Sequence, residues 1–366
     1  MVQYLNTFIG RKLLLVDLGS VWGGQEIYSK SIAREMGRRG WSVGCISPHT
    51  RHATEDVQYY PCKIDYPHFC QTARLVQTIG KDYDLIHFNG IRAIYLSLLL
   101  HKTKPFVGTK HLPYSCVGES FAKSKFARMA SKMVFYHLDR LICISDSIYE
   151  ELPTHFKERS TIIYNGVKDE GSPRFRFSQD QPLTICFVGR LVEHKGVIKL
   201  LEAADMLYQQ DIIVRTLVAG TGPLEQSLRA FVKERGLENI VSFLGYVESP
   251  GYVFRQSHAC VLPSLYEGLP LSLIEAMSAR CAVIGHDIPG VRKIIRHEQN
   301  GLMAENSSES LAESIQRLNS DRCLLERLRE TARKDYENQW QLDRMIDETE
   351  TVYREVIFSS LFKGSL

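Results

Sequence analysis

Two glutamates stand eight residues apart in the segment YEGLPLSLIEAM, which is otherwise mostly apolar. Pro270 suits the first turn of a helix, so LPLSLIEAMSA is predicted to be a helix, with Glu267 in the loop before it and Glu275 on its second turn. Ionised carboxylates only accept hydrogen bonds and match the neighbouring hydroxyl groups of a sugar. The pair indicates a site for a polyhydroxylated ligand, although a helix-terminal charge and an incidental surface glutamate would also explain it.

The backbone at the start of this predicted helix adds a second feature. The first N–H groups of a helix have no partner within the helix, and those of Leu271, Ser272 and Leu273 are expected to face the mouth of the loop. Such N–H groups suit an anion. The ligand is therefore expected to carry negative charge as well as hydroxyl groups.

Two cations, Arg190 and Lys195, flank a turn in the segment FVGRLVEHKG. The turn follows an apolar run and opens a helical pattern, so both side chains should lie beside a helix N-terminus. The partial charge of the helix and two full charges can together hold a diphosphate without a metal ion. Two solvated surface cations remain the alternative when this segment is taken alone.

Glycines follow two of the apolar runs, in GSVWGGQE and AGTGPLE. Gly23 and Gly24 could bring backbone N–H groups close to a phosphate at the start of a helix, but a tight turn explains them equally well. Neither segment has the G-x-G-x-x-G spacing, which argues against a dinucleotide cofactor. The pair Asp82 and Asp84 precedes an apolar run instead of following it, so it predicts a solvated strand entrance and no metal site.

These residues belong to a regular alternation of apolar runs and helical patterns, which predicts parallel sheets covered on both faces. In such sheets ligands bind beyond the carboxyl ends of the strands. The predicted strands are residues 12–19, 41–48, 84–89, 105–111, 140–145, 183–190, 212–220, 240–246, 259–264 and 281–287. The polar segment 169–182, with Gly, Ser and Pro, predicts a linker. The fold class is therefore α/β, with two doubly wound, Rossmann-like domains at residues 1–168 and 182–347.

Composition agrees with this division. A chain of 366 residues, 44% hydrophobic and 24% charged, suits about two soluble domains. Its nine cysteines never form Cys-x-x-Cys, so they predict neither a zinc site nor a disulfide framework, and a reducing cytosol fits. The apolar stretch AIYLSLLL is far shorter than the roughly 20 residues that a membrane-spanning helix needs.

Several segments in the second half together resemble a known family. FVGRLVEHKG, AGTGPLE, IVSFLGYV and ACVLPSLYEGLPLSLIEAMSARCAVIGHDIPGVRKIIRHEQNGLM follow one another as in the retaining family-4 glycosyltransferases of GT-B fold. Their E-x7-E pattern falls on Glu267 and Glu275. The resemblance is close over residues 182–320 and looser before, where GGQE, DLIHFNG, TKHLP, DRLICISDS and IIYNGV match in order.

The resemblance implies roles for individual residues. Arg190 and Lys195 would neutralise the donor diphosphate, Glu275 would accept from the ribose, and Glu267 would contact the transferred sugar. His111 resembles the histidine beside the reacting sugar. His87 is interpreted as a structural histidine. The donor-binding set is Gly23, Gly24, Gly189, Arg190, Lys195, Gly245, Tyr246, Glu267, Gly268, Leu269, Pro270, Leu271, Ser272 and Glu275. Gln25 departs from the alanine that many relatives have after the paired glycines.

The implied activity is that of a retaining, metal-independent hexosyltransferase that needs no cofactor. Its donor would be a nucleotide-diphosphate sugar, with UDP expected in preference to GDP. Its acceptor would be a saccharide or lipid-linked saccharide in the synthesis of bacterial lipopolysaccharide, capsule or exopolysaccharide. No nucleic acid is expected as a partner. A nucleotide-sugar epimerase, a phosphorylase or a non-catalytic sugar-nucleotide-binding protein of the same fold is the alternative.

Residues 1–168 hold 22 Lys and Arg against 14 Asp and Glu, so the excess of positive charge lies in the first half. There the segment ESFAKSKFARMASKMVFYHL predicts an amphipathic helix with a basic flank formed by Lys123, Lys125, Arg128 and Lys132. Such a helix suits an anionic membrane surface, although its apolar stripe could equally face the core. A cytoplasmic protein, peripheral on the inner face of the plasma membrane, is expected. The resemblance further implies that residues 348–366 pack back on the first domain.

Overall fold

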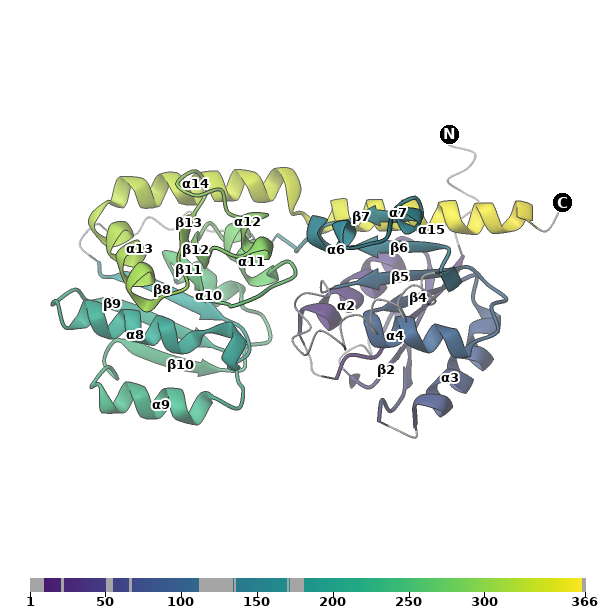
Figure 1. The fold of residues 1–366 in the computed structure, drawn as a ribbon, viewed down its shortest axis with the longest axis horizontal. Coiled ribbons are helices and arrows are strands. Elements are labelled where there is room, and N and C mark those ends of the chain that lie inside the picture. Colours follow the sequence, from purple (N-terminus) through teal and green to yellow (C-terminus); the bar gives the residue numbers. More distant parts are fainter. Residues whose placement is uncertain are drawn as a thin grey trace. The chain divides into compact units, whose positions relative to one another are not determined.

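The computed structural model describes residues 10–20, 23–50, 55–65, 68–111, 134, 136–169, 171 and 181–363, and the structural statements below concern these residues. The chain divides into two compact units. Unit 1 comprises Met1–Asn165 and Arg344–Leu366, and unit 2 comprises Gly166–Asp343. Each unit contains one sheet and the helices that pack on it (Figure 1).

The sheet of unit 1 has seven parallel strands in the order β3-β2-β1-β4-β5-β6-β7. Its centre is apolar on both faces, and Leu13, Leu14, Leu15 and Val16 are fully buried. The strands are β1 (Lys12–Asp17), β2 (Ser42–Ser47), β3 (Val57–Pro61), β4 (Leu85–Asn89), β5 (Phe106–Lys110), β6 (Arg140–Cys143) and β7 (Ser160–Ile162). The chain winds one way from β1 and the other way from β4, so the topological switch point lies between these two strands.

The helix that follows β1 is α2, whose residues Tyr28, Ile32 and Met36 recur every four positions and are buried. This spacing places one apolar stripe against the sheet. The helices of unit 1 are α2 (Gly24–Arg38), α3 (His68–Ile79), η3 (Gly80–Asp82), α4 (Ile91–Leu96), η4 (Ser97–Leu99), α6 (Asp146–Glu150), α7 (Thr154–Lys157) and, from Arg344 on, α15 (Leu342–Lys363).

Helix α15 packs on unit 1 although it lies far along the chain. Its apolar side chains Met345, Val352 and Val356 are buried. Glu350 of the helix accepts a hydrogen bond from Trp41 Nε1 at 3.1 Å and pairs with Arg39 at 2.8 Å. Burial of apolar side chains and the polar contacts of Glu350 therefore both hold α15 in unit 1.

The sheet of unit 2 has six parallel strands in the order β10-β9-β8-β11-β12-β13. The strands are β8 (Leu183–Val188), β9 (Val214–Ala219), β10 (Val241–Gly245), β11 (Ala259–Leu262), β12 (Ala282–His286) and β13 (Leu302–Ala304). The helices are η6 (Glu193–Lys195), α8 (Val197–Tyr208), α9 (Glu225–Glu234), α10 (Gly251–Arg255), α11 (Leu271–Ser278), α12 (Pro289–Arg292), α13 (Ser308–Ser320) and α14 (Arg322–Gln339). The switch point of this sheet lies between β8 and β11.

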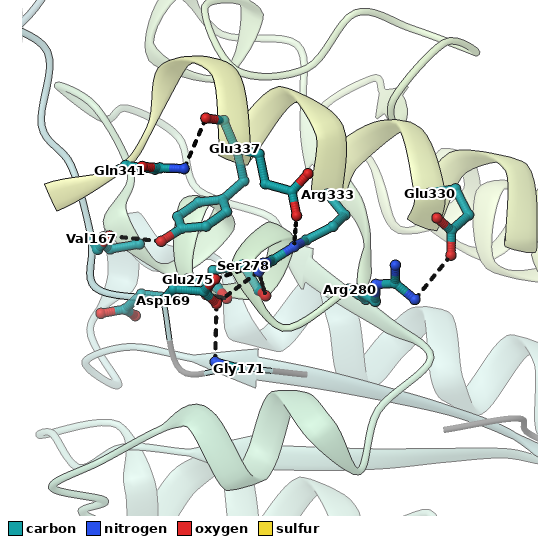
Figure 2. Close-up of polar contacts among 11 residues, drawn as sticks. Val167, Asp169, Gly171, Glu275, Ser278, Arg280, Glu330, Arg333, Glu337 and Gln341 are labelled. Carbon is teal, nitrogen blue, oxygen red and sulfur yellow. Dashed lines mark hydrogen bonds and ion pairs between the residues drawn. The ribbon is translucent and has the colours of Figure 1, made fainter. Parts of the chain in front are cut away.

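The chain passes from unit 1 to unit 2 at Asn165 and Gly166, earlier than the segment 169–182 that the sequence predicts as a linker. The reason is that residues just before this segment and at its start are bound to unit 2. Val167 N donates to the carbonyl of Trp340 at 2.9 Å. Arg333 of α14 binds both carboxylate oxygens of Asp169, at 2.7 and 2.6 Å (Figure 2). Backbone pairing and a bidentate ion pair thus move the boundary toward the N-terminus.

All ten strands predicted from the sequence are present, and three further short strands, β3, β7 and β13, join them. β13 and β7 have three residues each and lie at sheet edges, where a short segment carries little periodic signal. The eight cysteines in the described part of the chain are free thiols. No described helix is long and apolar enough to cross a membrane.

Candidate active site

The predicted residues Arg190, Lys195 and Glu267 of unit 2 lie in two loops that meet at the switch point of its sheet. One loop follows β8 and contains Arg190 and Lys195, and the other follows β11 and contains Glu267. β8 and β11 are hydrogen-bonded neighbours with Cys260 opposite Cys186. The carboxyl ends of two adjacent parallel strands therefore bring these loops together, where a doubly wound sheet binds its ligand.

A charged cluster joins the two loops. Lys195 Nζ lies 2.5 Å from Glu267 Oε1, and Ser264 Oγ donates to the same carboxylate oxygen at 2.7 Å. The side chains of Lys195 and Glu267 are 17% and 12% exposed, and Ser264 is fully buried. Because both donors bind Oε1, the carboxylate is fixed in orientation. No described residue binds Oε2, which is therefore the oxygen available to a ligand.

Backbone and ring contacts hold the same two loops in register. Leu265 N donates to the carbonyl of His194 at 2.8 Å, and the rings of His194 and Tyr266 stack with centroids 4.7 Å apart. Burial, followed by the charge of Lys195, lowers the pKa of His194. Gly196 has a φ of +64°, and a Cβ there would lie 2.1 Å from the carbonyl oxygen of Pro263. Only glycine permits this approach.

Arg190 differs from Lys195 because its side chain is exposed. Within the described residues it forms no ion pair, so its charge is available to a ligand. The loop of Arg190 packs against the AGTGPLE segment. Gly189 N donates to the carbonyl of Ala219 at 3.0 Å, and a Cβ on Gly220 would lie 1.8 Å from the carbonyl oxygen of Gly189. These glycines therefore serve close packing of two loops.

Helix α11 begins at Leu271, with Pro270 in an extended conformation as its N-cap. The sequence predicts free N–H groups at Leu271, Ser272 and Leu273. For Leu273 this prediction is wrong, because its N–H donates to the carbonyl of Pro270 at 3.2 Å. The N–H groups of Leu271 and Ser272 have no partner among the described residues. Leu269 is buried beneath the loop at 5% exposure.

Gly268 contributes backbone to a close contact with α12. A Cβ on Gly290 would lie 2.6 Å from the carbonyl oxygen of Glu267 and 2.9 Å from that of Gly268. Glu275 is half-buried on the second turn of α11, as the sequence predicts. Its carbonyl accepts from Ser278 Oγ at 2.7 Å, and the Ser278 carbonyl in turn accepts from Arg333 (Figure 2). Glu275 thus stands on a helix end that α14 holds in place.

Gly245 and Tyr246 lie at the end of the edge strand β10. Gly245 has a φ of +66°, which favours glycine, and its carbonyl accepts from Gly220 N at 2.7 Å. The Tyr246 side chain is 48% exposed. Gly245 and Tyr246 therefore form a turn after β10, and this turn contacts the turn after β9.

The switch point of unit 1 carries a second polar cluster. Asp17 ends β1 and lies in register with Asn89, which ends β4. Asn89 Oδ1 lies 2.7 Å from His111 Nε2, just after β5. Gln25 Nε2, on the first turn of α2, donates to Asp17 Oδ1 at 2.8 Å. The structure thus joins His111 to a network of three residues that the sequence did not single out for a role.

The two strand-end histidines of unit 1 have different surroundings. His87 is fully buried and both ring nitrogens are hydrogen-bonded, Nδ1 to Tyr353 OH at 2.5 Å and Nε2 to Thr109 Oγ1 at 2.7 Å. Burial lowers its pKa to about 3. The interpretation of His87 as a structural histidine is confirmed. Burial lowers the pKa of His111 to about 4, against an opposing effect of the Asp17 carboxylate.

Gly23 and Gly24 form the start of α2. Gly23 N donates to Glu26 Oε2 at 2.8 Å, so the N–H expected to face a phosphate already has a partner. Glu26 is buried, and a Cβ on Gly19 would lie 1.5 Å from its Oε1. The carboxylate therefore occupies the space that Gly19 leaves open, beside the helix N-terminus.

Asp82 and Asp84 lie just before β4, as the sequence predicts. Asp84 accepts from Lys12 N at 2.9 Å at the amino end of the sheet, opposite the edge that carries the switch point. No group of three or more His, Cys, Asp or Glu among the described residues could hold a metal ion. The predicted amphipathic helix with Lys123, Lys125, Arg128 and Lys132 lies outside the described residues.

Sequence reasoning missed Ser264, Asp17 and Asn89. Ser264 precedes Glu267 by three residues and ends the apolar run ACVLPS, so its position at a strand end was visible. Asp17 and Asn89 likewise end the runs KLLLVD and DLIHFN. A polar residue at the carboxyl end of a predicted parallel strand was the available signal for all three.

Two family models match the chain. Residues 22–170 match Glycosyltransferase Family 4, and residues 170–335 match Glycosyl transferases group 1. The chain is 27% identical over 368 residues to an uncharacterized glycosyltransferase of Methanocaldococcus jannaschii, which covers 91% of this chain and 94% of the relative. It is also 27% identical over 229 residues to an undecaprenol-linked-glycan α-1,4-N-acetyl-D-galactosaminyltransferase of Campylobacter jejuni, covering 60% and 62% of the two chains.

Solved structures share the arrangement of strands and helices. A sucrose-phosphate synthase of Thermosynechococcus elongatus superposes with a TM-score of 0.78 at 19% identity, over 95% of this chain and all of the other. Anabaena HepE in complex with UDP and glucose gives a TM-score of 0.78 at 18% identity, over 94% and 100%. With its two doubly wound sheets, its E-x7-E loop at the second switch point and both family models matched, the chain belongs to the family-4, group 1 glycosyltransferases of GT-B fold.

Proposed function

We infer that this glycosyltransferase moves a hexosyl group, with retention, from a nucleotide-diphosphate sugar to a saccharide or lipid-linked saccharide. The observation that carries the proposal is the cluster at the switch point of unit 2, where Lys195, Ser264 and Glu267 lie within hydrogen-bond distance and Arg190 is exposed beside them. The cluster combines full positive charges with an oriented carboxylate. A diphosphate and a sugar need these two features.

The charges suggest how the reaction is assisted. Breaking the bond between the anomeric carbon and phosphate leaves negative charge on the departing nucleoside diphosphate, so cations placed there lower the barrier. Arg190 and the N–H groups of Leu271 and Ser272 supply donors to the diphosphate. Lys195 supplies a second cation while it orients Glu267 toward the transferred sugar. Glu275 accepts from the ribose, and Gly189, Gly245 and Tyr246 form the surrounding loops.

UDP is the proposed nucleotide, in preference to GDP. Anabaena HepE, a fold relative, is described in complex with UDP-glucose. Polysaccharide synthesis is the proposed pathway, because the chain is 29% identical over 182 residues to a putative colanic acid biosynthesis glycosyltransferase of Escherichia coli. His111, Gly23 and Gly24 of unit 1 are proposed as further residues that contact the donor.

The most direct test is donor hydrolysis in the absence of an acceptor. UDP-, GDP- and ADP-sugars are incubated with the protein, and release of the nucleoside diphosphate is measured with and without EDTA. We expect slow hydrolysis of a UDP-sugar that survives chelation. Arg190→Ala should lower the rate by about tenfold or more, because it removes charge from the transition state.

Arg215→Ala is the matched control, because Arg215 is another exposed arginine of unit 2, on β9. It should leave the rate unchanged. Loss of activity in EDTA with recovery in Mn²⁺ or Mg²⁺ would contradict the metal-free mechanism. Conversion of the nucleotide sugar to its epimer, or tight binding with no turnover, would favour the epimerase or the binding protein.

A cytoplasmic protein, peripheral on the inner face of the plasma membrane, is proposed from the positive charge of residues 1–168. Vesicles that contain anionic lipid should sediment the protein at low salt and release it as salt screens the charges. Replacing Lys123, Lys125, Arg128 and Lys132 with serine should abolish sedimentation while donor hydrolysis continues. Equal sedimentation with neutral vesicles, or none with anionic ones, would favour a soluble acceptor.

A further inference from the structure

We propose that Asn89 is a positioning residue that fixes His111 in the tautomer with the proton on Nε2, so that Nδ1 accepts a hydrogen bond from a sugar hydroxyl. The proposal rests on the proposed function, because it takes the sugar-binding role of His111 as given. It assigns a task to Asn89, Asp17 and Gln25, which the family resemblance leaves without one.

The Asp17 carboxylate determines how the side chains around it are oriented. The residue is fully buried, and four donors of the described residues, from three parts of the chain, bind its carboxylate. Gly19 N and Gln25 Nε2 donate to Oδ1 at 3.2 and 2.8 Å. Ser29 Oγ and Asn89 Nδ2 donate to Oδ2 at 2.5 and 3.2 Å. A carboxylate can only accept in these contacts, so it dictates which atom of each partner faces it.

This constraint decides the orientation of the Asn89 amide. Its nitrogen lies between two acceptors, Asp17 Oδ2 at 3.2 Å and the carbonyl of Gln25 at 3.0 Å. An amide oxygen in that position would face two other oxygens without a proton between them. The amide therefore directs Nδ2 toward Asp17, and Oδ1 is the atom 2.7 Å from His111 Nε2.

An amide oxygen has no proton to give, so His111 Nε2 must be the donor in this contact. In a neutral imidazole one nitrogen donates and the other accepts, which leaves the lone pair on Nδ1. Within the described part of the chain, Nδ1 has no hydrogen-bond partner. The ring is also held edge-on by Tyr28, with centroids 5.0 Å apart. An oriented acceptor that no described residue occupies is suited to a hydroxyl group.

Gln25 is the residue that stands where many relatives have alanine, and the structure accounts for it. Its side chain spans the switch point, since Nε2 reaches Asp17 Oδ1 at 2.8 Å and the carbonyl of Asn89 at 3.3 Å. It packs directly over Gly90, where φ is +82° and a Cβ would lie 2.4 Å from Gln25 Oε1. Gln25 therefore fills the space above β1 and β4 and holds Asp17 and Asn89 in register.

The test measures the tautomer of His111 directly. Two-bond ¹H–¹⁵N correlation spectra of ¹⁵N-histidine-labelled full-length protein at pH 7 distinguish the two neutral tautomers and the imidazolium. His111→Gln assigns the His111 signals by their loss. His87 is an internal control, because both of its nitrogens are bonded to other partners. We expect the Nε2–H tautomer for His111 in the wild type.

Two variants separate the roles of the amide. Asn89→Leu keeps the approximate size but removes the acceptor, so His111 should populate the Nδ1–H tautomer. In Asn89→Asp one carboxyl oxygen remains as the acceptor for His111, and the other takes the place of Nδ2 beside Asp17 Oδ2, so the two carboxyl groups should share one proton. The variant should therefore retain the proton of His111 on Nε2. Unchanged His87 signals in each variant report that the fold of unit 1 is intact.

Kinetics connect the tautomer to the proposed function. With UDP-glucose as the probe, Asn89→Leu should lower kcat for donor hydrolysis by about tenfold or more, because a hydroxyl loses its oriented acceptor. Asn89→Asp should lower it less. The affinity for UDP alone, measured by calorimetry, should stay unchanged in both variants, since the proposed nucleotide residues belong to unit 2.

The outcomes distinguish the two proposals. A wild-type His111 that carries its proton on Nδ1, or that is an imidazolium at pH 7, overturns the inference. So does an Asn89→Leu variant whose tautomer and kcat equal those of the wild type. If the tautomer is as expected but no nucleotide sugar of the panel is hydrolysed, the proposed function fails while the positioning by Asn89 stands.

Discussion

Both sheets carry polar residues at their switch points, but the surroundings of these residues differ. At the switch point of unit 1, Asp17 and Asn89 are fully buried and every contact between them and Gln25 is made by neutral donors. At the switch point of unit 2, Lys195 and Glu267 form an ion pair with side chains 17% and 12% exposed, and Arg190 is exposed. One edge is a buried hydrogen-bond network, and the other is an accessible group of charges.

The difference has a physical meaning. A buried carboxylate persists only where donors satisfy it, so Asp17 contributes to stability through the network around it. Partly exposed charges lose less solvation and remain free to exchange partners with a ligand. We therefore expect substitutions at the first switch point to affect stability most, and those at the second to affect activity most.

The largest effect should come from Asp17→Ala. It leaves the donors of Gln25, Ser29 and Asn89 without their acceptor, which should lower the free energy of unfolding by about 3 kcal/mol. Hydrogen exchange followed by mass spectrometry should show faster exchange in β1 and β4 but not in β8. Asp84→Ala, at the solvated end of the same sheet, is the control and should have little effect. Equal protection of β1 in the wild type and Asp17→Ala would break the comparison.

Lys195→Ala should lower activity and leave stability nearly unchanged. Donor hydrolysis should fall about tenfold or more, on the order of 1.4 kcal/mol at the transition state, while protection of unit 2 changes little. Lys199 provides a matched control, because it lies in the first turn of α8 and binds Asn306 at 2.6 Å. A large loss of stability with unchanged kcat would show that the ion pair serves the fold.

The two glutamates should divide binding from turnover. Glu267→Gln should lower kcat and leave UDP affinity nearly unchanged, because Glu267 is oriented by Lys195 and Ser264 in the loop proposed to face the sugar. Glu275→Gln should weaken UDP binding by about fivefold, since it removes a charged acceptor. Calorimetry and single-turnover hydrolysis separate the two quantities. Identical UDP affinities for wild type and Glu275→Gln would refute the assignment to the ribose.

The smallest effect concerns a charge of unit 2 outside the site. Hydrogen bonds from Arg333 lower the pKa of Asp169 below its ordinary 3.8. The unfolded chain therefore takes up this proton first as the pH falls, so the pair stabilises the fold above pH 3.8 and loses its contribution below. Because Asp169 is 44% exposed, Asp169→Asn should cost only about 1 kcal/mol or less at pH 7.

Urea midpoints of the wild type and Asp169→Asn should differ at neutral pH and converge in acid. Asp287→Asn is the control, because Asp287 pairs with Arg292 at a more exposed position, with Arg292 59% exposed. It should change the midpoint less. A constant difference at all pH values would mean that Asp169 acts through something other than its charge.

The sequence predicts the strands and the charged loops because both depend on local order. Apolar runs such as KLLLVD need only their own residues to specify a buried strand, and Glu267 follows one of them closely. The network around Asp17 could not be predicted in the same way. Asn89 and His111 come from separate strands, and their partners depend on which strands become neighbours. The binding of Asp169, the first residue of the predicted linker, could not be predicted locally either, because its partner Arg333 lies 164 residues later.

Helix α15 has a consequence for how the protein is made. Unit 2 is one continuous stretch, Gly166–Asp343, inserted between the two parts of unit 1. The partners of Trp41 and His87, Glu350 and Tyr353, leave the ribosome only after all of unit 2 has been translated. At a synthesis rate of about 5–20 residues per second, the sheet of unit 1 waits on the order of ten seconds or more for its last helix. The second half of the chain can thus finish folding before the first.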